Sequence, residues 1–168
     1  MFESRLARID DAPRIARLQA TSWESRGIIS FTDDEADQFA EATQQWEIAI
    51  RDMQSQGRVL VVEIHGEVVG FAAISVSQPA EFSELVALEV DPTHRREGIG
   101  SRLINAAADI AVRMNAHMIR AWVEESEIAA QTLLRETGWA TSGATRVTQN
   151  ESGQNRNESE WITYLHKG

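Results

Sequence analysis

The order of apolar and polar positions predicts alternating strands and helices along most of the 168-residue chain. Alternation over Ser4 to Ile9 predicts a first strand. Asp10 or Asp11 can then cap a helix that tolerates Pro13 in its first turn. The apolar face of this helix is predicted to hold Ile15, Leu18 and Trp23.

A second helix is predicted to begin at the capping box Thr32-Asp33-Asp34-Glu35, whose first and last side chains satisfy each other's backbone amides. Apolar residues then recur at helical spacing, and Gly57 lies just beyond the end. This stripe consists of Phe39, Ala42, Trp46, Ile50 and Met53. We interpret it as core packing.

Three strands are predicted next, over Arg58 to Ile64, Val68 to Val76 and Glu84 to Val90, with His65-Gly66-Glu67 as a tight hairpin connection. A helix follows, with an apolar stripe of Ile99, Leu103, Ala107, Ile110, Ala111 and Met114. The remaining predicted elements are a strand over Met118 to Val123, a helix capped by Ser126 and ended by Gly138, and a hairpin of Trp139 to Val147 and Glu160 to Leu165 around the polar loop 151–159.

The predicted order is therefore β-α-α-β-β-β-α-β-α-β-β, which indicates an α/β (α+β mixed sheet) fold with helices on both faces. A length of 168 residues fits one domain, over residues 1–168. We therefore expect a single hydrophobic core system rather than two independent units.

Composition narrows the function classes. Cysteine is absent, which excludes disulfides, thiolate zinc sites and a cysteine nucleophile. No signal sequence or membrane-length apolar run is present, so we expect a cytoplasmic protein without a membrane partner. The net charge of −10 argues against nucleic-acid binding and would suit electrostatic steering of a cationic amine. The four histidines lack metal-ligand spacing, so no metal site is expected.

The segment from Glu84 to Arg102, ELVALEVDPTHRREGIGSR, is the strongest chemical signal. It predicts a strand, a basic and glycine-containing turn, and a helix whose first amides are unpaired and carry partial positive charge. Gly98 and Gly100 remove side chains that would keep a ligand away from these amides, and Arg95, Arg96 and Arg102 add positive charge. Such a turn suits a pyrophosphate.

Two other phosphate motifs do not fit this turn. A P-loop requires Gly-Lys-Ser/Thr, but Gly100 is followed by Ser101-Arg102. A dinucleotide fingerprint requires a third glycine, and the position three residues after Gly100 is Leu103.

Arg95-x-x-Gly98-x-Gly100 resembles the (Gln/Arg)-x-x-Gly-x-(Gly/Ala) motif of the GNAT acyltransferase superfamily. Leu85-x-x-Leu88-x-Val90-x-Pro92 precedes it at the spacing usual in this family, and Gly138-Trp139 stands where the family often has Gly-Phe. The matching element order covers nearly the whole chain, from Ser4 to Leu165.

The resemblance implies the GNAT fold and acetyl-CoA as co-substrate. In such proteins the Glu84-to-Val90 strand splays from its parallel neighbour, and the pantetheine arm lies between the two. Backbone groups of Leu88 and Val90 would pair with the arm. The motif turn would hold the pyrophosphate, mainly through backbone amides; its residues are Arg95, Arg96, Gly98, Ile99, Gly100 and Ser101.

Acetyl transfer to an amine needs a free lone pair, and an amine with a pKa near about 10.4 is almost entirely protonated at neutral pH. A general base is therefore the first catalytic group to seek. Glu84, eleven residues before Arg95, resembles the catalytic glutamate of some histone-acetylating members. Glu89 is the competitor, but strand alternation places it on the opposite face unless a bulge intervenes.

The chain departs from the family at the general acid. Many members have a tyrosine four residues before the Gly-(Phe/Trp) pair, to protonate the departing thiolate, and an asparagine seven residues earlier. Here these positions are Leu134 and Glu127, and the single tyrosine, Tyr164, lies on the last predicted strand. Three alternatives remain: the thiolate leaves unaided, another residue supplies the proton, or catalysis is weak or lost.

The sequence therefore predicts an N-acyltransferase that acts on a primary amine of a small molecule or peptide. The alternative is a coenzyme-A-binding sensor or regulatory module without catalysis; a homodimer is compatible with either. In this fold the acceptor pocket is built by segments equivalent to Thr21 to Asp34 and Val147 to Ser159. Residues of the first segment that could line it are Trp23, Glu24, Arg26, Phe31 and Asp33.

Overall fold

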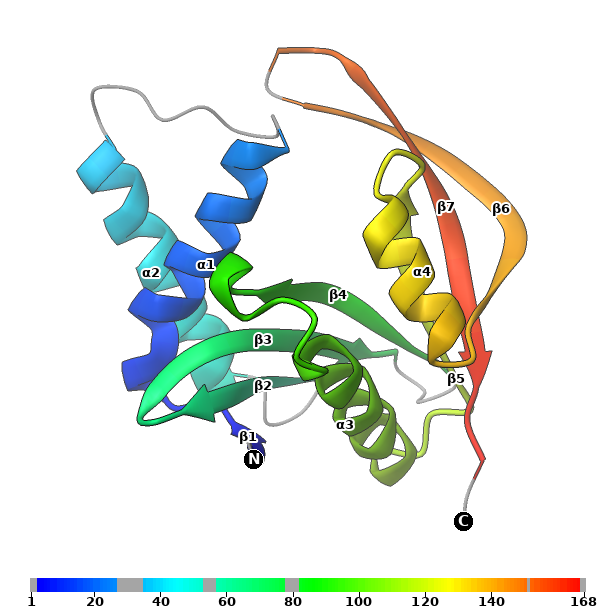
Figure 1. The fold of residues 1–168 in the computed structure, drawn as a ribbon, viewed down its shortest axis with the longest axis horizontal. Helices are drawn as coiled ribbons and strands as arrows, with labels where there is room; N and C mark the ends of the chain where they lie inside the picture. The colour runs from blue at the N-terminus through cyan, green and yellow to red at the C-terminus, as the bar shows by residue number, and fades with distance from the viewer. Residues whose placement is uncertain (1–2, 27–34, 53–56, 78–81, 151, 167–168) are drawn as a thin grey trace.

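A computed structural model describes residues 3–26, 35–52, 57–77, 82–150 and 152–166. The elements are β1 (Glu3–Leu6), α1 (Ala12–Ser25), α2 (Glu35–Asp52), β2 (Gly57–Ile64), β3 (Glu67–Val76), β4 (Phe82–Val90), α3 (Ile99–Arg113), β5 (Met118–Glu124), α4 (Ile128–Glu136), β6 (Ala140–Gln149) and β7 (Asn155–Tyr164). This order confirms the predicted β-α-α-β-β-β-α-β-α-β-β arrangement (Figure 1).

The seven strands form one mixed sheet in the order β1-β2-β3-β4-β5-β7-β6. β1 to β4 pair antiparallel to their neighbours, as do β5 with β7 and β6 with β7. β4 and β5 form the parallel pair, which α3 connects. The predicted βαβ crossover is thus present in the middle of the chain.

Two apolar clusters occupy the two faces of this sheet. The cluster on the α3 side includes Leu103 and Ala107 of α3, Leu134 of α4 and Leu85 of β4. The cluster on the other side includes Ile15 and Leu18 of α1, and Trp46 and Ile50 of α2 pack against it. Figure 1 shows α1 and α2 beside one another and apart from α3 and α4. Helices therefore cover both faces, as the sequence predicts.

The apolar stripe of α2 packs against the outer part of the core cluster on the α1 side. Trp46 meets the buried ring of Phe71 edge-on, with ring centroids 5.2 Å apart. The Trp46 indole N–H also donates to the Gln19 side chain of α1 at 3.1 Å. Core packing is thus confirmed for Trp46 and Ile50, although both stay half-buried. Met53 and the first three residues of the predicted capping box, Thr32 to Asp34, lie outside the described residues.

Several predicted boundaries differ from the structure. Ile9 belongs to a 3₁₀ turn, Ile9–Asp11, and not to the first strand. Gly57 opens β2, where an added Cβ would lie 2.4 Å from the carbonyl oxygen of Ile74. The polar stretch 151–159 is not all loop, because β7 begins at Asn155. Within the described part of the chain, no helix combines the length and apolarity that a membrane crossing requires.

Candidate active site at the splayed strands

β4 and β5 are paired only at one end. Their parallel ladder joins Phe82 to Met118, Ser83 to Ile119 and Glu84 to Arg120. The fully buried Ser83 hydroxyl donates to the Met118 carbonyl at 3.3 Å and fixes this paired end. Beyond Glu84, β4 continues to Val90 and β5 to Glu124 without further pairing between them. We call residues 85–90 the unpaired edge of β4.

The backbone at Leu88 and Val90 points toward this unpaired edge. The Asp91 N–H donates to the Val69 carbonyl of β3 at 2.8 Å, so the amide of residue 91 points toward β3. Backbone groups alternate in direction along a strand, so those of Glu89 also point toward β3 and those of Leu88 and Val90 point away from it. Leu88 and Val90 therefore offer the backbone groups that an extended ligand would need.

The turn after β4 presents open amides at the start of α3. Gly98 is the N-cap, with φ of 83°, and no side chain caps the helix. The first helical bond runs from the Arg102 N–H to the Gly98 carbonyl at 3.0 Å. The amides of Ile99, Gly100 and Ser101 precede that bond and have no carbonyl partner within the helix. A serine or aspartate cap would have occupied one of these donors.

The same turn contains a second left-handed residue and several cations. Arg96 has φ of 63°, a conformation that costs a non-glycine residue about 1–2 kcal/mol. Gly98, which is left-handed and is followed by the right-handed first residue of α3, can aim neighbouring amides into one concavity, which suits anions. Arg95, Arg96 and Arg102 are exposed here. His94 lies against Glu97, with Nδ1 3.0 Å from Oε2, and so fills the turn.

Gly100 has a packing reason that the sequence did not reveal. A Cβ added at Gly100 would lie 2.8 Å from Cδ2 of Leu133 in α4. Its missing side chain therefore lets α4 approach the first turn of α3. The absence of a side chain at Gly100 thus makes room for Leu133, and its role in ligand access stays a prediction.

Asp91 connects the turn to the body of the protein. Its carboxylate accepts hydrogen bonds from the Thr93 backbone N–H at 2.9 Å and from Arg14 Nη2 at 2.6 Å. Arg14, on α1, also donates to the Val68 carbonyl at 2.9 Å. The Thr93 amide, more than the Thr93 hydroxyl and Arg14, holds the pKa of Asp91 below its usual value, against a smaller opposing effect of burial. The ionised carboxylate therefore stabilises the link between β4 and α3.

A bulge changes which face each carboxylate of β4 occupies. Ala73 of β3 pairs with Ala87 and Ile74 pairs with Leu85, so Val86 is an extra residue in β4. Leu85 belongs to the cluster on the α3 side, whereas Ala87 packs on the α1 side. Alternation from these two residues places both Glu84 and Glu89 on the α1 side of the sheet. The bulge that would bring Glu89 to the same face as Glu84 is therefore present.

Glu84 lies at the paired end of the two strands. Arg120, its cross-strand neighbour on β5, brings Nε to 3.5 Å from the Glu84 Oε1 atom. Arg120 also contacts Glu160 of β7 at 3.5 Å and lies over the Phe82 ring, 4.7 Å from its centroid. Glu84 therefore belongs to a group of cross-strand contacts in which Arg120 lies between two carboxylates.

Glu89 lies beside the unpaired edge, close to the C-terminal end of α1. Its side chain is 13% exposed, and its Oε1 atom is 3.8 Å from Nη1 of Arg26. Burial raises the pKa of the Glu89 carboxyl, while a hydrogen bond from Ser22 and the charges of Arg26 and Arg95 oppose that rise. The proximity of Glu127 raises it further. The structure thus adds Ser22 to the candidate site and brings together Glu89 and Arg26, both named from the sequence.

The structure also places the two positions where the chain departs from the family pattern. Leu134 is 3% exposed and belongs to the core cluster on the α3 side. Glu127 precedes α4, with its Oε1 atom 2.9 Å from Nε of Arg26. That nitrogen is buried without an aligned hydrogen-bond partner among the described residues, so the contact is an ion pair. Tyr164 is 67% exposed at the end of β7.

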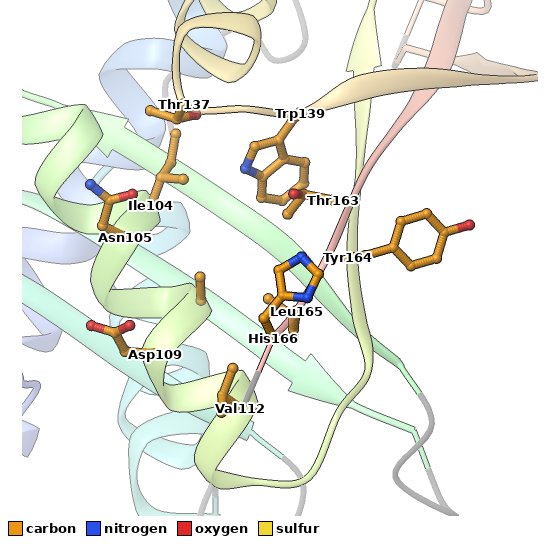
Figure 2. A pocket seen from close by; sticks show the side chains of 11 residues that line it. Ile104, Asn105, Asp109, Val112, Thr137, Trp139, Thr163, Tyr164, Leu165 and His166 are labelled. Atoms are coloured by element: carbon orange, nitrogen blue, oxygen red, sulfur yellow. The ribbon is translucent and has the colours of Figure 1, made fainter. Parts of the chain in front are cut away.

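One pocket lies away from this region. It has a volume of about 240 Å³ and lies between α3 and the end of β7. Figure 2 shows Asn105 and Asp109 of α3 on one side of the pocket. The Trp139 ring and the His166 side chain lie on the other side. It contains none of the residues predicted to bind the cofactor or catalyse. In the described ranges, no group of three histidine, aspartate or glutamate residues is placed to hold a metal ion.

Known proteins share this sequence pattern and fold. The chain is 35% identical over 78 residues to an uncharacterized N-acetyltransferase from Archaeoglobus fulgidus, a match that covers 44% of this chain and 53% of that relative. The chain thus spans about half the length of this curated relative. The crystal structure of ribosomal-protein-alanine N-acetyltransferase from Brucella melitensis superposes with a TM-score of 0.77 at 26% identity, over 97% of this chain and 99% of that one.

A putative acetyltransferase from Salmonella typhimurium, solved with its cofactor acetyl-CoA, shares the fold with a TM-score of 0.76 at 22% identity, over 100% of this chain and 96% of that one. The sequence model of the Acetyltransferase (GNAT) family matches residues 15–139, well over half of the chain. That match includes α3, the complete motif turn and both carboxylates of β4. The chain belongs to the GNAT acetyltransferase family.

Proposed function

We propose that this protein transfers an acetyl group from acetyl-CoA directly to a primary amine of a small molecule or peptide. The unpaired edge of β4 carries the proposal, because Leu88 and Val90 direct backbone groups toward it and the open amides of α3 follow. An extended arm with a pyrophosphate at one end fits this arrangement of donors and acceptors. Family membership supplies the reaction class.

In the proposed complex, the backbone at Leu88 and Val90 pairs with the pantetheine arm. The pyrophosphate accepts hydrogen bonds from the first turn of α3, whose dipole favours negative charge. Charge from Arg95 and Arg96 adds to this attraction on a protein with a net charge of −10. The full set of proposed cofactor-binding residues is Leu88, Val90, Arg95, Arg96, Gly98, Ile99, Gly100 and Ser101.

The chemical step requires a neutral amine beside the thioester. The nitrogen lone pair attacks the carbonyl carbon, the carbon–sulfur bond breaks, and the thiolate leaves while a base takes the amine proton. The motif spacing makes Glu84 the first candidate for that base, and Glu89 now lies on the same face. A thiol with a pKa near about 8.5 leaves as the anion without a proton donor, which suits a buried Leu134.

Leu134 also favours the second candidate function, a coenzyme-A-binding module without catalysis. The experiment that separates the two combines calorimetry of acetyl-CoA binding with thiol release over an amine panel. The panel should include polyamines, amino acids, lysine peptides and an alanine N-terminal peptide, the last because of the Brucella melitensis structure. Binding with turnover supports the transferase, and binding without turnover on any amine favours the module. Absence of binding refutes both.

A further inference from the structure

Two carboxylates on β4 can receive the proton of the acceptor amine, and the bulge at Val86 brings both to the α1 face. We propose that Glu89, and not Glu84, is the catalytic base that takes this proton. The inference rests on the proposed acetyl transfer, because it assigns a role within that reaction. The position of each glutamate along β4 and the cations beside each carboxylate both favour Glu89.

Position along β4 separates the two residues. Glu84 is in the last paired position, opposite Arg120, whereas Glu89 lies between Leu88 and Val90 on the unpaired edge. Because Val86 is an extra residue, Glu84 and Glu89 pair with residues only four positions apart on β3, which places them roughly 13 Å apart along the strand. An arm bound along the unpaired edge therefore passes Glu89 directly, while Glu84 stays behind the point where the strands separate.

Charge compensation also differs. Arg120 lies 3.5 Å from Glu84 on the facing strand, and its place is fixed by Glu160 and the Phe82 ring. Glu84 thus faces a guanidinium on the neighbouring strand at the end where β4 and β5 are paired. This contact suits Glu84 to holding the two strands together there.

The neighbours of Glu89 leave it able to accept a proton. Arg26 is the cation nearest to it among its ion pairs, at 3.8 Å, and Arg26 approaches Glu127 more closely, at 2.9 Å. The Ser22 hydroxyl donates to Glu89, and Arg95 acts on it from the motif turn. Because burial has the largest effect, the pKa of the Glu89 carboxyl is raised above its ordinary value, which favours proton acceptance.

The proton balance of the step is simple. The acceptor enters as an ammonium ion, and an Oε atom of Glu89 takes one proton and frees the nitrogen lone pair. The nitrogen then attacks the thioester carbonyl, and its second proton is lost to solvent as the carbon–sulfur bond breaks. The coenzyme thiolate leaves, and Glu89 then releases the proton to solvent. Ser22 and Arg26 position the carboxylate at the C-terminal end of α1.

The experiment compares Glu89→Gln with Glu84→Gln, and uses Glu136→Gln, an exposed residue in the last turn of α4, as the matched control. We expect Glu89→Gln to lower kcat about 10²- to 10⁴-fold at pH 7 and to leave the Kd for acetyl-CoA within about threefold. Its rate should rise about tenfold per pH unit up to the amine pKa, because only the free amine then reacts. Any loss in Glu84→Gln should be the same at every pH, and Glu136→Gln should match the wild type.

The urea midpoint of unfolding gives a second test. A purely structural role for Glu89 predicts a lower midpoint in Glu89→Gln, whereas a role as the base does not. A carboxyl whose folded pKa is raised contributes stability below its unfolded pKa and loses it as the pH rises through the folded pKa. Glu89→Gln should therefore keep or raise the urea midpoint at pH 7. Glu89→Asp retains the carboxylate, so it should keep the pH profile of the wild type at a lower kcat.

The outcomes separate the two proposals. A wild-type protein that turns over no amine means that the proposed function fails. A wild-type protein with turnover, together with a pH-dependent loss in Glu84→Gln and none in Glu89→Gln, overturns only the assignment of the base. A lower urea midpoint for Glu89→Gln, with an unchanged pH profile, would also overturn it, because Glu89 would then be an ordinary ion-pair partner of Arg26.

Discussion

Replacing Gly100 by alanine tests the contact between α3 and α4 that positions the motif turn. A Cβ at Gly100 would lie 2.8 Å from Cδ2 of Leu133. Carbon atoms in ordinary contact are about 3.5–4.0 Å apart, so the Leu133 side chain or all of α4 must withdraw by roughly 1 Å. Both residues are half-buried, and Leu133 packs against the core cluster on the α3 side.

Two opposing effects set the size of the change. Overpacking of this kind costs up to about 3 kcal/mol of unfolding free energy, and less where the flexible end of the Leu133 side chain rotates away. Alanine is favoured over glycine within a helix by about 0.5–1 kcal/mol. Gly100→Ala alone should therefore be destabilising by up to about 2.5 kcal/mol. In a Leu133→Ala background the clash disappears, and the same substitution should become stabilising by about 0.5–1 kcal/mol.

A double-mutant cycle followed by urea unfolding measures this directly. The expected coupling energy between Gly100→Ala and Leu133→Ala is about 1–3 kcal/mol, well above the error of additivity for distant sites. Asn105→Ala, at an exposed position of α3, reports the helix-propensity gain without a clash. Additive effects of the two substitutions would refute the packing explanation. Gly100 would then be needed only for ligand approach, and its alanine variant would lose acetyl-CoA affinity without losing stability.

Three further predictions concern the motif turn and α4. Gly98→Ala forces φ of 83° on a side chain, so it should cost about 1–2 kcal/mol in urea unfolding and weaken acetyl-CoA binding in calorimetry. The lowered pKa of Asp91 provides stability that is present above its unfolded value and lost as the pH falls through its folded value. Urea midpoints measured from pH 5 downward should therefore fall more steeply in the wild type than in Asp91→Asn. Leu134→Tyr should lower the urea midpoint by overpacking a side chain that is 3% exposed, and should give no increase in kcat.

The order of elements could be predicted because their apolar periods are local and regular. The hairpin at His65-Gly66 follows the same logic, since both residues take positive φ, 51° and 80°, as a tight turn of the primed type requires. The motif turn could be predicted in the same way, because Gly98 directly precedes α3 as its N-cap. The sequence thus predicts the elements whose conformation depends on their own residues and not on distant contacts.

The start of β7 could not be predicted in the same way. Residues 155–159 are mostly polar, and β6, their partner, is exposed almost throughout. Backbone pairing and contacts such as Arg146 to Glu158, at 2.9 Å, hold this part of the hairpin together. Because this pairing involves polar residues, the sequence shows no apolar alternation here and its polar composition predicts a loop.

The site was predicted less completely than the fold, because its decisive features join distant residues. The reason for Gly100 is Leu133, which is 33 positions away in the chain. The surroundings of Glu89 come from α1 and from the residue before α4. The sequence could state only that a bulge would change the face of Glu89. Leu85 to Leu88 are all apolar, so either face assignment suits them and the extra residue leaves no sign.

That extra residue links the fold to the chemistry. Val86 follows the last β4–β5 pair, Glu84 with Arg120, by two positions. A bulge bends its strand and increases the local twist, which turns β4 away from its parallel neighbour at that point. The same insertion shifts the alternation, so that Leu88 and Val90 pack toward α3 while Glu89 faces Ser22 and Arg26 on α1. One residue therefore both separates the strands where the thioester arm is proposed to lie and directs a buried carboxylate to the face from which an amine would approach.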